Sequence, residues 1–339
     1  MKVRLLYLGN QLSKHGLNTT TIETLGPELE RLGFEMVYAS SKKSFLFRLL
    51  DMLWATIVHR NKVSYILIDT YSTKAFWYAF LCAQLARLLK IKYIPILHGG
   101  NLPNRLKSNP KLCRMLFANA YKNVVPSGYL KQAFENEGFT NVVLIPNAIE
   151  IEKYTFKNRA TLAPKLLWVR AFASIYNPEM AVRVLQQLQK TYPEATLTMV
   201  GPDKDGSLQT TKAVAASLEI TVTFTGQLIK EAWWQLAAEH DIFINTTHFD
   251  NTPVSVLEAM ALGLPVVSTN VGGIPYLIAH DVNGKLVPDA DTNAMVAAVT
   301  QLLQQPDQTQ LLIQKAHSYV TQMNWEAVKE MWVEVIGNG

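Results

Sequence analysis

The chain of 339 residues is long enough for two domains, and its hydrophobic content of 49% and charged content of 17% exclude an intrinsically disordered protein. Its two cysteines, Cys82 and Cys113, are too few for a disulfide scaffold and lack metal-ligand spacing, so we interpret both as reduced thiols. The net charge of +5 is unevenly distributed along the chain. Residues 1–150 contain 19 Lys and Arg and 9 Asp and Glu, whereas residues 151–339 contain 13 Lys and Arg and 18 Asp and Glu.

The basic first half of the chain predicts contact with an anionic partner. An anionic membrane surface or a phosphate-bearing acceptor fits this charge, and a basic surface that serves solubility is the alternative. Nucleic acid is not expected as a partner, because the sequence holds no nucleic-acid-binding motif and no dense cluster of Lys and Arg. The N-terminus has too short an apolar run for a signal peptide, so we expect a cytoplasmic protein.

Segments typical of buried strands alternate with helical patterns along the whole chain, which indicates parallel sheets covered on both faces. In the first half, strands are predicted at 3–8, 34–39, 64–70, 92–97, 123–127 and 141–146. In the second half, they are predicted at 165–169, 196–200, 222–225, 241–245, 265–269 and 284–288. Helical patterns lie near 20–32, 75–89, 178–190, 207–218, 230–239 and 253–262. The alternation predicts an α/β fold with two doubly wound, Rossmann-like domains, a hinge after Asn147 and a cleft between them.

The segment Ser44–Lys62 combines a wide apolar helix face with surrounding Lys and Arg. Such a helix either lies on a membrane surface or packs against the first sheet, and both interpretations stay open. The most apolar segment, Ala75–Leu89, is shorter than the ~20 residues that a bilayer-spanning helix needs, so no transmembrane helix is predicted. We therefore expect at most peripheral contact with the inner face of a membrane.

Polar residues and glycines follow the predicted strands: His98, Gly99, Arg170, Gly201, Gly226 and Asp250. Because ligands of open parallel sheets bind at the carboxyl ends of the strands, we expect a binding site there. A guanidinium at a strand end stabilises a diphosphate or forms a structural ion pair across the cleft between the domains. A histidine followed by two glycines either contacts a ligand or is structural.

The helix predicted at 253–262 carries one carboxylate, Glu258, among apolar residues. Thr252 is the expected N-cap, Pro253 suits the first helical position, and Gly263 is expected to end the helix. A buried carboxylate needs donors, and the vicinal diol of a ribose supplies two hydroxyls; a solvated surface position is the alternative. Backbone amides at the start of this helix are candidates for binding phosphate, at Asn251, Thr252, Val254 and Ser255.

The stretch from Phe249 to Gly273 resembles the signature of the retaining, nucleotide-sugar-dependent glycosyltransferases of family four. That signature consists of two glutamates separated by seven residues, then Ala-Met-Ala, a Gly-x-Pro-Val-Val run and two glycines. The matching residues here are Glu258, Ala259, Met260, Ala261, Gly263, Pro265, Val266, Val267, Gly272 and Gly273. The segments 143–149, 197–206 and 222–226 also resemble family segments, so the likeness is close in the second domain and loose in the first.

The resemblance implies the GT-B fold, with residues 1–152 as an acceptor-side domain and residues 153–323 as the nucleotide-sugar donor domain. It also implies that a C-terminal helix, 324–337, packs back on the first domain. Glu258 would contact the ribose of the donor, Arg170 the diphosphate and His98 the sugar. The other residues expected at the donor are Gly99, Gly201, Gly226, Gln227, Leu228, Asp250, Asn251, Thr252, Pro253, Val254 and Ser255.

Two positions depart from the family pattern. Asp250 stands where the first glutamate is expected, and the lysine that follows the family's arginine is missing, so Lys204 is the candidate substitute. The resemblance implies no metal and no other cofactor.

The implied activity is retaining hexosyl transfer from a nucleotide-diphosphate sugar, with a UDP-sugar favoured, to a carbohydrate or lipid-linked carbohydrate. Cell-surface polysaccharide or glycolipid synthesis is the expected role. The alternatives are a GT-B sugar-nucleotide epimerase and a catalytically silent sugar-nucleotide-binding protein.

Overall fold

The computed structural model describes residues 3–15 and 20–337, and the chain divides into two compact units. The first unit runs to Asn147 and includes the chain again from Val328, and the second unit runs from Ala148 to Ala327. The sequence analysis places the same division between residues 152 and 153 and the returning helix at 324–337.

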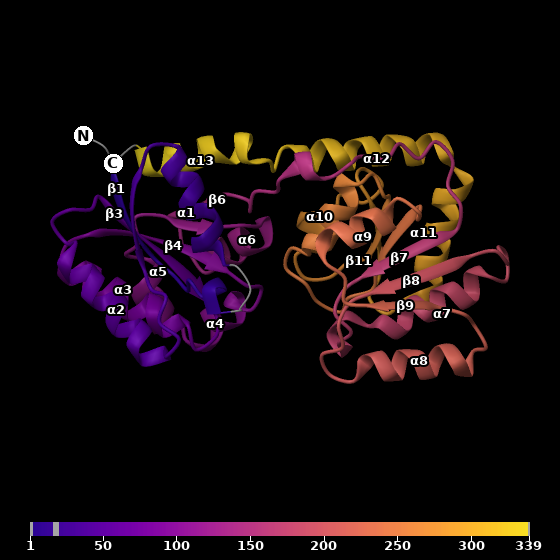
Figure 1. Ribbon diagram of the computed structural model, residues 1–339, viewed down its shortest axis with the longest axis horizontal. Coiled ribbons are helices and arrows are strands. Elements are labelled where there is room, and N and C mark those ends of the chain that lie inside the picture. Colours follow the sequence, from indigo (N-terminus) through magenta and orange to yellow (C-terminus); the bar gives the residue numbers. More distant parts are fainter. Residues whose placement is uncertain (1–2, 16–19, 338–339) are drawn as a thin grey trace. The chain divides into compact units, whose positions relative to one another are not determined.

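The first unit contains a six-stranded parallel sheet in the order β2-β1-β3-β4-β5-β6 (Figure 1). Its strands are β1 (Arg4–Leu8), β2 (Glu35–Ala39), β3 (Tyr65–Tyr71), β4 (Lys92–His98), β5 (Asn123–Val125) and β6 (Val142–Leu144). The chain moves from β1 outward to β2 and then returns to β3 on the other side of β1. The sheet therefore has a topological switch point between β1 and β3, where doubly wound folds bind ligands.

Helices cover both faces of this sheet, as its strands of nearly continuous apolar residues require. They are α1 (Thr21–Arg31), α2 (Phe45–Val58), α3 (Phe76–Leu88), α4 (Leu102–Ser108), α5 (Pro110–Phe117) and α6 (Gly128–Asn136). The last helix, α13 (Trp325–Gly337), belongs to the first unit from Val328 onward. The crossovers through α1 and α2 run in opposite directions, so right-handed connections place these helices on opposite faces. α2 packs beside α3 and α3 packs beside α5, so these three helices form one layer (Figure 1).

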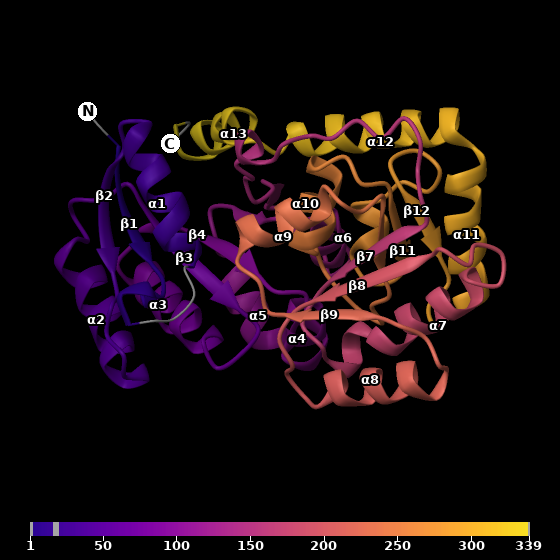
Figure 2. The same ribbon diagram turned by 45° about the vertical axis from the view of Figure 1, so that its right-hand side comes forward.

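The second unit contains another six-stranded parallel sheet, in the order β12-β11-β10-β7-β8-β9 (Figure 2). Its strands are β7 (Lys165–Val169), β8 (Thr196–Val200), β9 (Thr223–Gly226), β10 (Ile242–Asn245), β11 (Val266–Thr269) and β12 (Lys285–Val287). The chain moves from β7 to β8 and β9 and then returns to β10 on the other side of β7. The switch point of this sheet thus lies between β7 and β10, the strands that precede Arg170 and Asp250.

Two helical layers enclose the second sheet. The helices are α7 (Pro178–Leu188), α8 (Ser207–Ser217), α9 (Lys230–Ala237), α10 (Val254–Ala261), α11 (Thr292–Gln304) and α12 (Pro306–Thr321). Successive side chains of β7 point to opposite faces of the sheet. Leu166 packs in the core beneath α7 and α11, and Leu167 packs in the core beneath α9 and α10. Each sheet face therefore has its own apolar core.

All twelve predicted strands are confirmed, with ends that differ by a few residues. The expected N-cap of α10 is wrong: the helix begins at Val254, and Pro253 occupies the cap position without a side-chain hydrogen bond. Gly263 follows the last turn at φ +76°, as a residue that ends a helix does. In the part of the chain that the structure describes, no helix has the length and apolar character needed to cross a membrane.

Candidate functional site

Arg170 and Asp250 form an ion pair at the switch point of the second sheet. Arg170 directly follows β7, and Asp250 lies in the loop between β10 and α10. The guanidinium carbon of Arg170 lies 4.5 Å from the centre of the Tyr176 ring, and Oδ1 of Asp250 accepts a hydrogen bond from the Asn251 amide at 2.8 Å. The ion pair of Arg170 thus lies within the second unit, and its partner is Asp250, itself a candidate site residue.

Glycines hold the backbone on both sides of this ion pair. A Cβ atom at Gly201 would lie 1.8 Å from the carbonyl oxygen of Arg170, and one at Gly273 would lie 1.9 Å from that of Asn251. The Gly273 amide also donates to the Asp250 carbonyl at 2.7 Å. Because any side chain at these two glycines would displace the site's backbone, the loop packing itself fixes where Arg170 and Asp250 lie.

Two buried polar atoms near the start of α10 and the end of β7 lack a hydrogen-bond partner among the described residues. They are Nε of Arg170 and Oγ of Ser255. Buried polar groups in proteins are nearly always paired, so unpaired ones at a sheet's switch point are candidates for ligand contacts. Val254, next to Ser255, is half exposed, and Pro253 is buried.

Glu258 is buried on α10, with 3% of its surface exposed. Its Oε1 accepts a hydrogen bond from the Tyr154 hydroxyl at 3.0 Å and lies 3.2 Å from Nζ of Lys230. Burial raises the pKa of the Glu258 carboxyl, and Lys230 and Tyr154 partly oppose that shift. The solvated alternative for Glu258 is therefore wrong. Its measured contacts are with Tyr154 and Lys230, not with the Arg170–Asp250 pair.

Tyr154 and Lys230 are not among the residues predicted from the sequence. Tyr154 lies in the irregular segment before β7, and that segment is held in place by Arg159. The buried guanidinium of Arg159 donates to the carbonyl groups of Ala237, His240 and Leu262 at 2.8 to 3.0 Å. Lys230 begins α9 at the carboxyl end of β9, a position that the strand-end argument could have included.

The remaining donor-side candidates lie along the same rim of the second sheet. The Gly201 amide donates to the Gly226 carbonyl at 2.9 Å, which joins the ends of β8 and β9. Gln227 is exposed and Leu228 packs partly against the core beneath α9 and α10. Lys204 is exposed, and its amide donates to the Phe172 carbonyl at 2.9 Å.

Asp203 and Asp205, which flank Lys204, have the Asp-x-Asp spacing of some metal sites, but each bonds to donors of this chain. Asp203 accepts from the Gly206 amide at 3.0 Å, and Asp205 accepts from the Ser174 amide at 2.8 Å and from the Ser207 hydroxyl. These bonds lower the pKa of Asp205 to about 2. Among residues 3–15 and 20–337 no group of three His, Cys, Asp or Glu side chains has an arrangement suited to a metal ion.

His98 belongs to a buried polar cluster at the switch point of the first sheet. Its Nε2 lies 2.9 Å from Oδ1 of Asp69, which also accepts a hydrogen bond from the Tyr7 hydroxyl at 3.0 Å. The Tyr71 ring stacks on the imidazole at 4.8 Å, and a Cβ atom at Gly9 would lie 2.5 Å from Oδ2 of Asp69. Tyr7, Asp69 and Tyr71 are not among the predicted site residues, because each lies within a largely apolar strand.

Gly99 follows His98 at φ +86°, a conformation that favours glycine. No described atom lies within 4 Å of the position that its Cβ would take. The backbone is therefore open at this point, and contact of Gly99 with a ligand stays a prediction.

Both the sequence and the fold of the chain resemble those of known proteins. Residues 163–305 match the family model described as "Glycosyl transferases group 1". The amylovoran biosynthesis glycosyltransferase AmsK of Erwinia amylovora is 29% identical over 246 residues, which cover 68% of this chain and 60% of AmsK. A glycogen synthase of Mycobacterium tuberculosis is 24% identical over 201 residues, 58% of this chain and 49% of that protein. The matches thus span only about half to three fifths of these relatives.

Solved structures resemble the whole chain. Anabaena HepE in complex with UDP has a TM-score of 0.76 and 16% identity, and sucrose-phosphate synthase from Thermosynechococcus elongatus has a TM-score of 0.74 and 17% identity. In both cases the alignment covers 100% of each chain. The protein has the GT-B fold, and residues 163–305 of its second unit resemble the glycosyl transferases group 1.

Proposed function

We propose that the protein is a retaining glycosyltransferase. It moves a hexosyl unit from a nucleotide-diphosphate sugar, with a UDP-sugar favoured, to a hydroxyl of a carbohydrate or lipid-linked carbohydrate. The observation that carries this proposal is the buried carboxylate of Glu258 on the same unit and sheet rim as the Arg170–Asp250 pair. AmsK, named for amylovoran biosynthesis, supports a role in cell-surface polysaccharide or glycolipid synthesis, and HepE, solved with UDP, supports a UDP-sugar as the donor.

In the proposed complex, the ribose diol donates two hydrogen bonds to Glu258. A carboxylate can accept both, and hydrogen bonds to a charged group contribute about 1.5–3 kcal/mol each. Lys230, which contacts Oε1 of Glu258, opposes the rise in pKa that burial causes, and so favours the ionised form that accepts both bonds.

Transfer breaks the bond between the anomeric carbon and the diphosphate oxygen, and the electron pair leaves with the diphosphate. The acceptor oxygen forms the new bond on the face that the leaving group vacates, and its proton passes to the departing diphosphate. Arg170 and the amides of Val254 and Ser255 stabilise the charge that develops on the diphosphate. Asp250 orients the sugar, and His98 of the first unit contacts it. In this proposal Arg170 supplies the positive charge, so turnover should survive EDTA.

A thermal-shift panel with UDP, GDP and ADP tests the binding step, and turnover with the sugar donor of the best nucleotide tests the transfer. Glu258→Gln should weaken nucleotide binding by about 10- to 100-fold, whereas the exposed control Glu239→Gln should leave it unchanged. Product analysis by NMR then checks that the anomeric configuration is retained.

Two outcomes would favour the alternatives. Consumption of the nucleotide sugar without any acceptor would indicate an epimerase. Nucleotide binding without release of a diphosphate product, with every donor and acceptor pair, would indicate a silent binding protein.

A further inference from the structure

Helix α2 exposes an apolar face along its whole length. Trp54 is 65% exposed, Phe47 64% and Leu46 59%. Further exposed apolar residues on the helix are Phe45, Leu50, Ile57 and Val58. Contiguous apolar surface of this kind marks an interaction site, because isolated soluble domains rarely leave it uncovered.

The opposite side of α2 attaches the helix to the first sheet. Leu49 and Met52 are buried in the core of the first unit, and Arg48 is buried beneath the helix. Nε of Arg48 donates to the Tyr78 hydroxyl at 3.2 Å, and its Nη1 donates to the Lys42 carbonyl at 3.0 Å. Both interpretations of Ser44–Lys62 therefore hold in part: one side packs on the sheet, and the other side remains an exposed apolar face.

The neighbouring helix α3 extends the exposed apolar surface in the same helical layer. Trp77 is 43% exposed and Leu88 79% exposed, and both belong to a helix that packs beside α2. We call the exposed apolar residues of α2 and α3, together with Lys42 and Lys43, the α2–α3 face.

The charge around the α2–α3 face is positive. Lys42 and Lys43 precede α2, and Arg60 and Lys62 follow it, all exposed. Residues 70–134, which include α3 and α5 of the same layer, contain ten Lys and Arg and no Asp or Glu. Two copies of so basic a surface repel each other, whereas an anionic surface attracts it, so the charge favours an anionic partner over a second copy of the chain.

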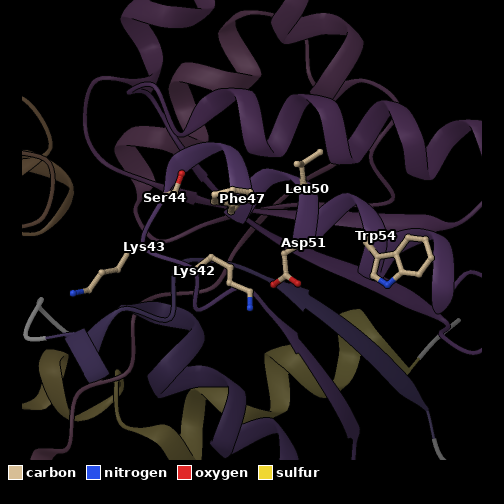
Figure 3. Close-up of a pocket in the computed structure, with 7 residues that line it drawn as sticks. All are labelled: Lys42, Lys43, Ser44, Phe47, Leu50, Asp51 and Trp54. Atoms are coloured by element: carbon tan, nitrogen blue, oxygen red, sulfur yellow. The ribbon is translucent and has the colours of Figure 1, made fainter.

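A hollow of about 660 Å³ lies where charge and apolar surface meet. Its lining residues are Lys42, Lys43, Ser44, Phe47, Leu50, Asp51 and Trp54 (Figure 3). In this view the lysines extend from the start of α2, and Trp54 projects from a later turn of the helix. Aromatic rings beside basic groups suit the boundary between phosphate head groups and acyl chains.

We propose that the α2–α3 face binds the surface of an anionic phospholipid bilayer, with α2 lying in the plane of the interface. Trp54, Phe47 and Leu46 enter the acyl boundary, and the flanking lysines contact the lipid phosphates. This inference goes beyond glycosyl transfer, because binding to vesicles needs neither donor nor turnover and can fail or succeed independently of them.

Sedimentation with vesicles tests the proposal. The full chain should sediment with vesicles of equal parts phosphatidylglycerol and phosphatidylcholine at low salt and stay in solution with pure phosphatidylcholine vesicles. Phe47→Ser with Trp54→Ser should abolish binding, and each of Lys42→Gln and Lys43→Gln should weaken it about fivefold. The control Leu311→Ser removes an apolar residue of similar exposure, 57%, from the second unit and should bind normally.

Three results would overturn the proposal. They are no sedimentation with either vesicle, sedimentation that the Phe47 and Trp54 substitutions leave unchanged, and a concentration-dependent dimer that those substitutions dissociate in the absence of lipid. Leu46→Ser provides a second variant of the face, and thermal unfolding checks that each variant is folded.

Discussion

Nε2 of His98 lies 2.9 Å from Oδ1 of Asp69, a carboxylate that is almost fully buried. An ionised carboxylate only accepts hydrogen bonds, so Nε2 is the nitrogen that donates to Asp69, and in the neutral imidazole Nδ1 is then the acceptor. The Tyr7 hydroxyl bonds to the same oxygen and fixes the carboxylate from the neighbouring strand β1. Asp69 thus sets both the orientation and the tautomer of His98 without reaching the surface.

Asp69→Asn is therefore expected to lower turnover while the KM for the donor changes little. An asparagine can present either its oxygen or its NH₂ group to Nε2, so His98 loses its fixed tautomer and position. Misplacement of a contacting group costs on the order of 10- to 100-fold in rate. Steady-state kinetics measures the loss, and nitrogen NMR of the imidazole should show a changed tautomer ratio. Tyr7→Phe keeps the His98 bond and should cost much less; equal losses in both variants would contradict the positioning role.

Most of the fold could be predicted from the sequence because parallel strands buried on both faces are continuous apolar runs. Leu5 to Leu8, Ile66 to Ile68 and Leu166 to Trp168 are all buried, and each lies in a predicted strand. Ligands of open parallel sheets bind at the carboxyl ends of the strands, and these ends can be located without a structure. His98, Arg170 and Asp250 could therefore be selected as candidate site residues.

The partners of these residues could not be predicted from the same patterns. Asp69 contacts Tyr7 across 62 residues and His98 across 29, and Tyr154 contacts Glu258 across 104. Such contacts depend on strand order, which apolar runs do not specify. Tyr7 and Asp69 are also single polar residues within apolar strands, so their sequence positions indicate burial and give no sign of a polar cluster.

Glu258 should make the stability of the protein depend on pH. Burial raises its pKa above the ordinary value of 4.5, so the folded protein keeps this proton at pH values where the unfolded chain has released it. The contribution of Glu258 to the free energy of unfolding is therefore largest below pH 4.5, and it decreases as the pH rises through the raised pKa. Glu258→Gln should remove this fall and make the variant more stable than the wild type at neutral pH. Denaturant unfolding across acidic to neutral pH measures the effect.

Lys230→Met provides the matched test, since Lys230 opposes the shift. Without Lys230, the free energy of unfolding should continue to fall to a higher pH when Glu258 is present. The same substitution should have no such effect in the Glu258→Gln variant. Parallel pH profiles for all four proteins would contradict a raised pKa at Glu258.

Arg170→Ala should reduce turnover on the order of 100-fold or more, because it removes the fixed charge proposed to face the diphosphate. The turnover of Arg170→Lys should lie between that of the wild type and that of Arg170→Ala, since lysine keeps the charge but loses the planar fork of the guanidinium. The double variant Arg170→Ala with Asp250→Asn leaves no unpaired carboxylate. Comparing it with Arg170→Ala separates the loss of catalysis from the cost of leaving Asp250 unpaired. Arg183→Ala removes a surface ion pair with Glu179 and should change neither activity nor stability. A loss of only a few-fold in Arg170→Ala would contradict the charge-stabilising role.

The backbones of Gly201 and Gly226 are joined by a hydrogen bond, but replacing each glycine by alanine should have a different effect on stability and turnover. A Cβ at Gly201 would lie 1.8 Å from the Arg170 carbonyl oxygen, so Gly201→Ala must displace the backbone of Arg170. At Gly226, with φ +72°, no described atom lies within 4 Å of the Cβ position, so only the left-handed conformation costs energy, ~1–2 kcal/mol. Gly201→Ala should lower the free energy of unfolding by ~3 kcal/mol or more and reduce turnover as Arg170 moves. Denaturant unfolding and steady-state kinetics of both variants measure the difference, and equal losses would mean that Gly201 does not determine the position of Arg170.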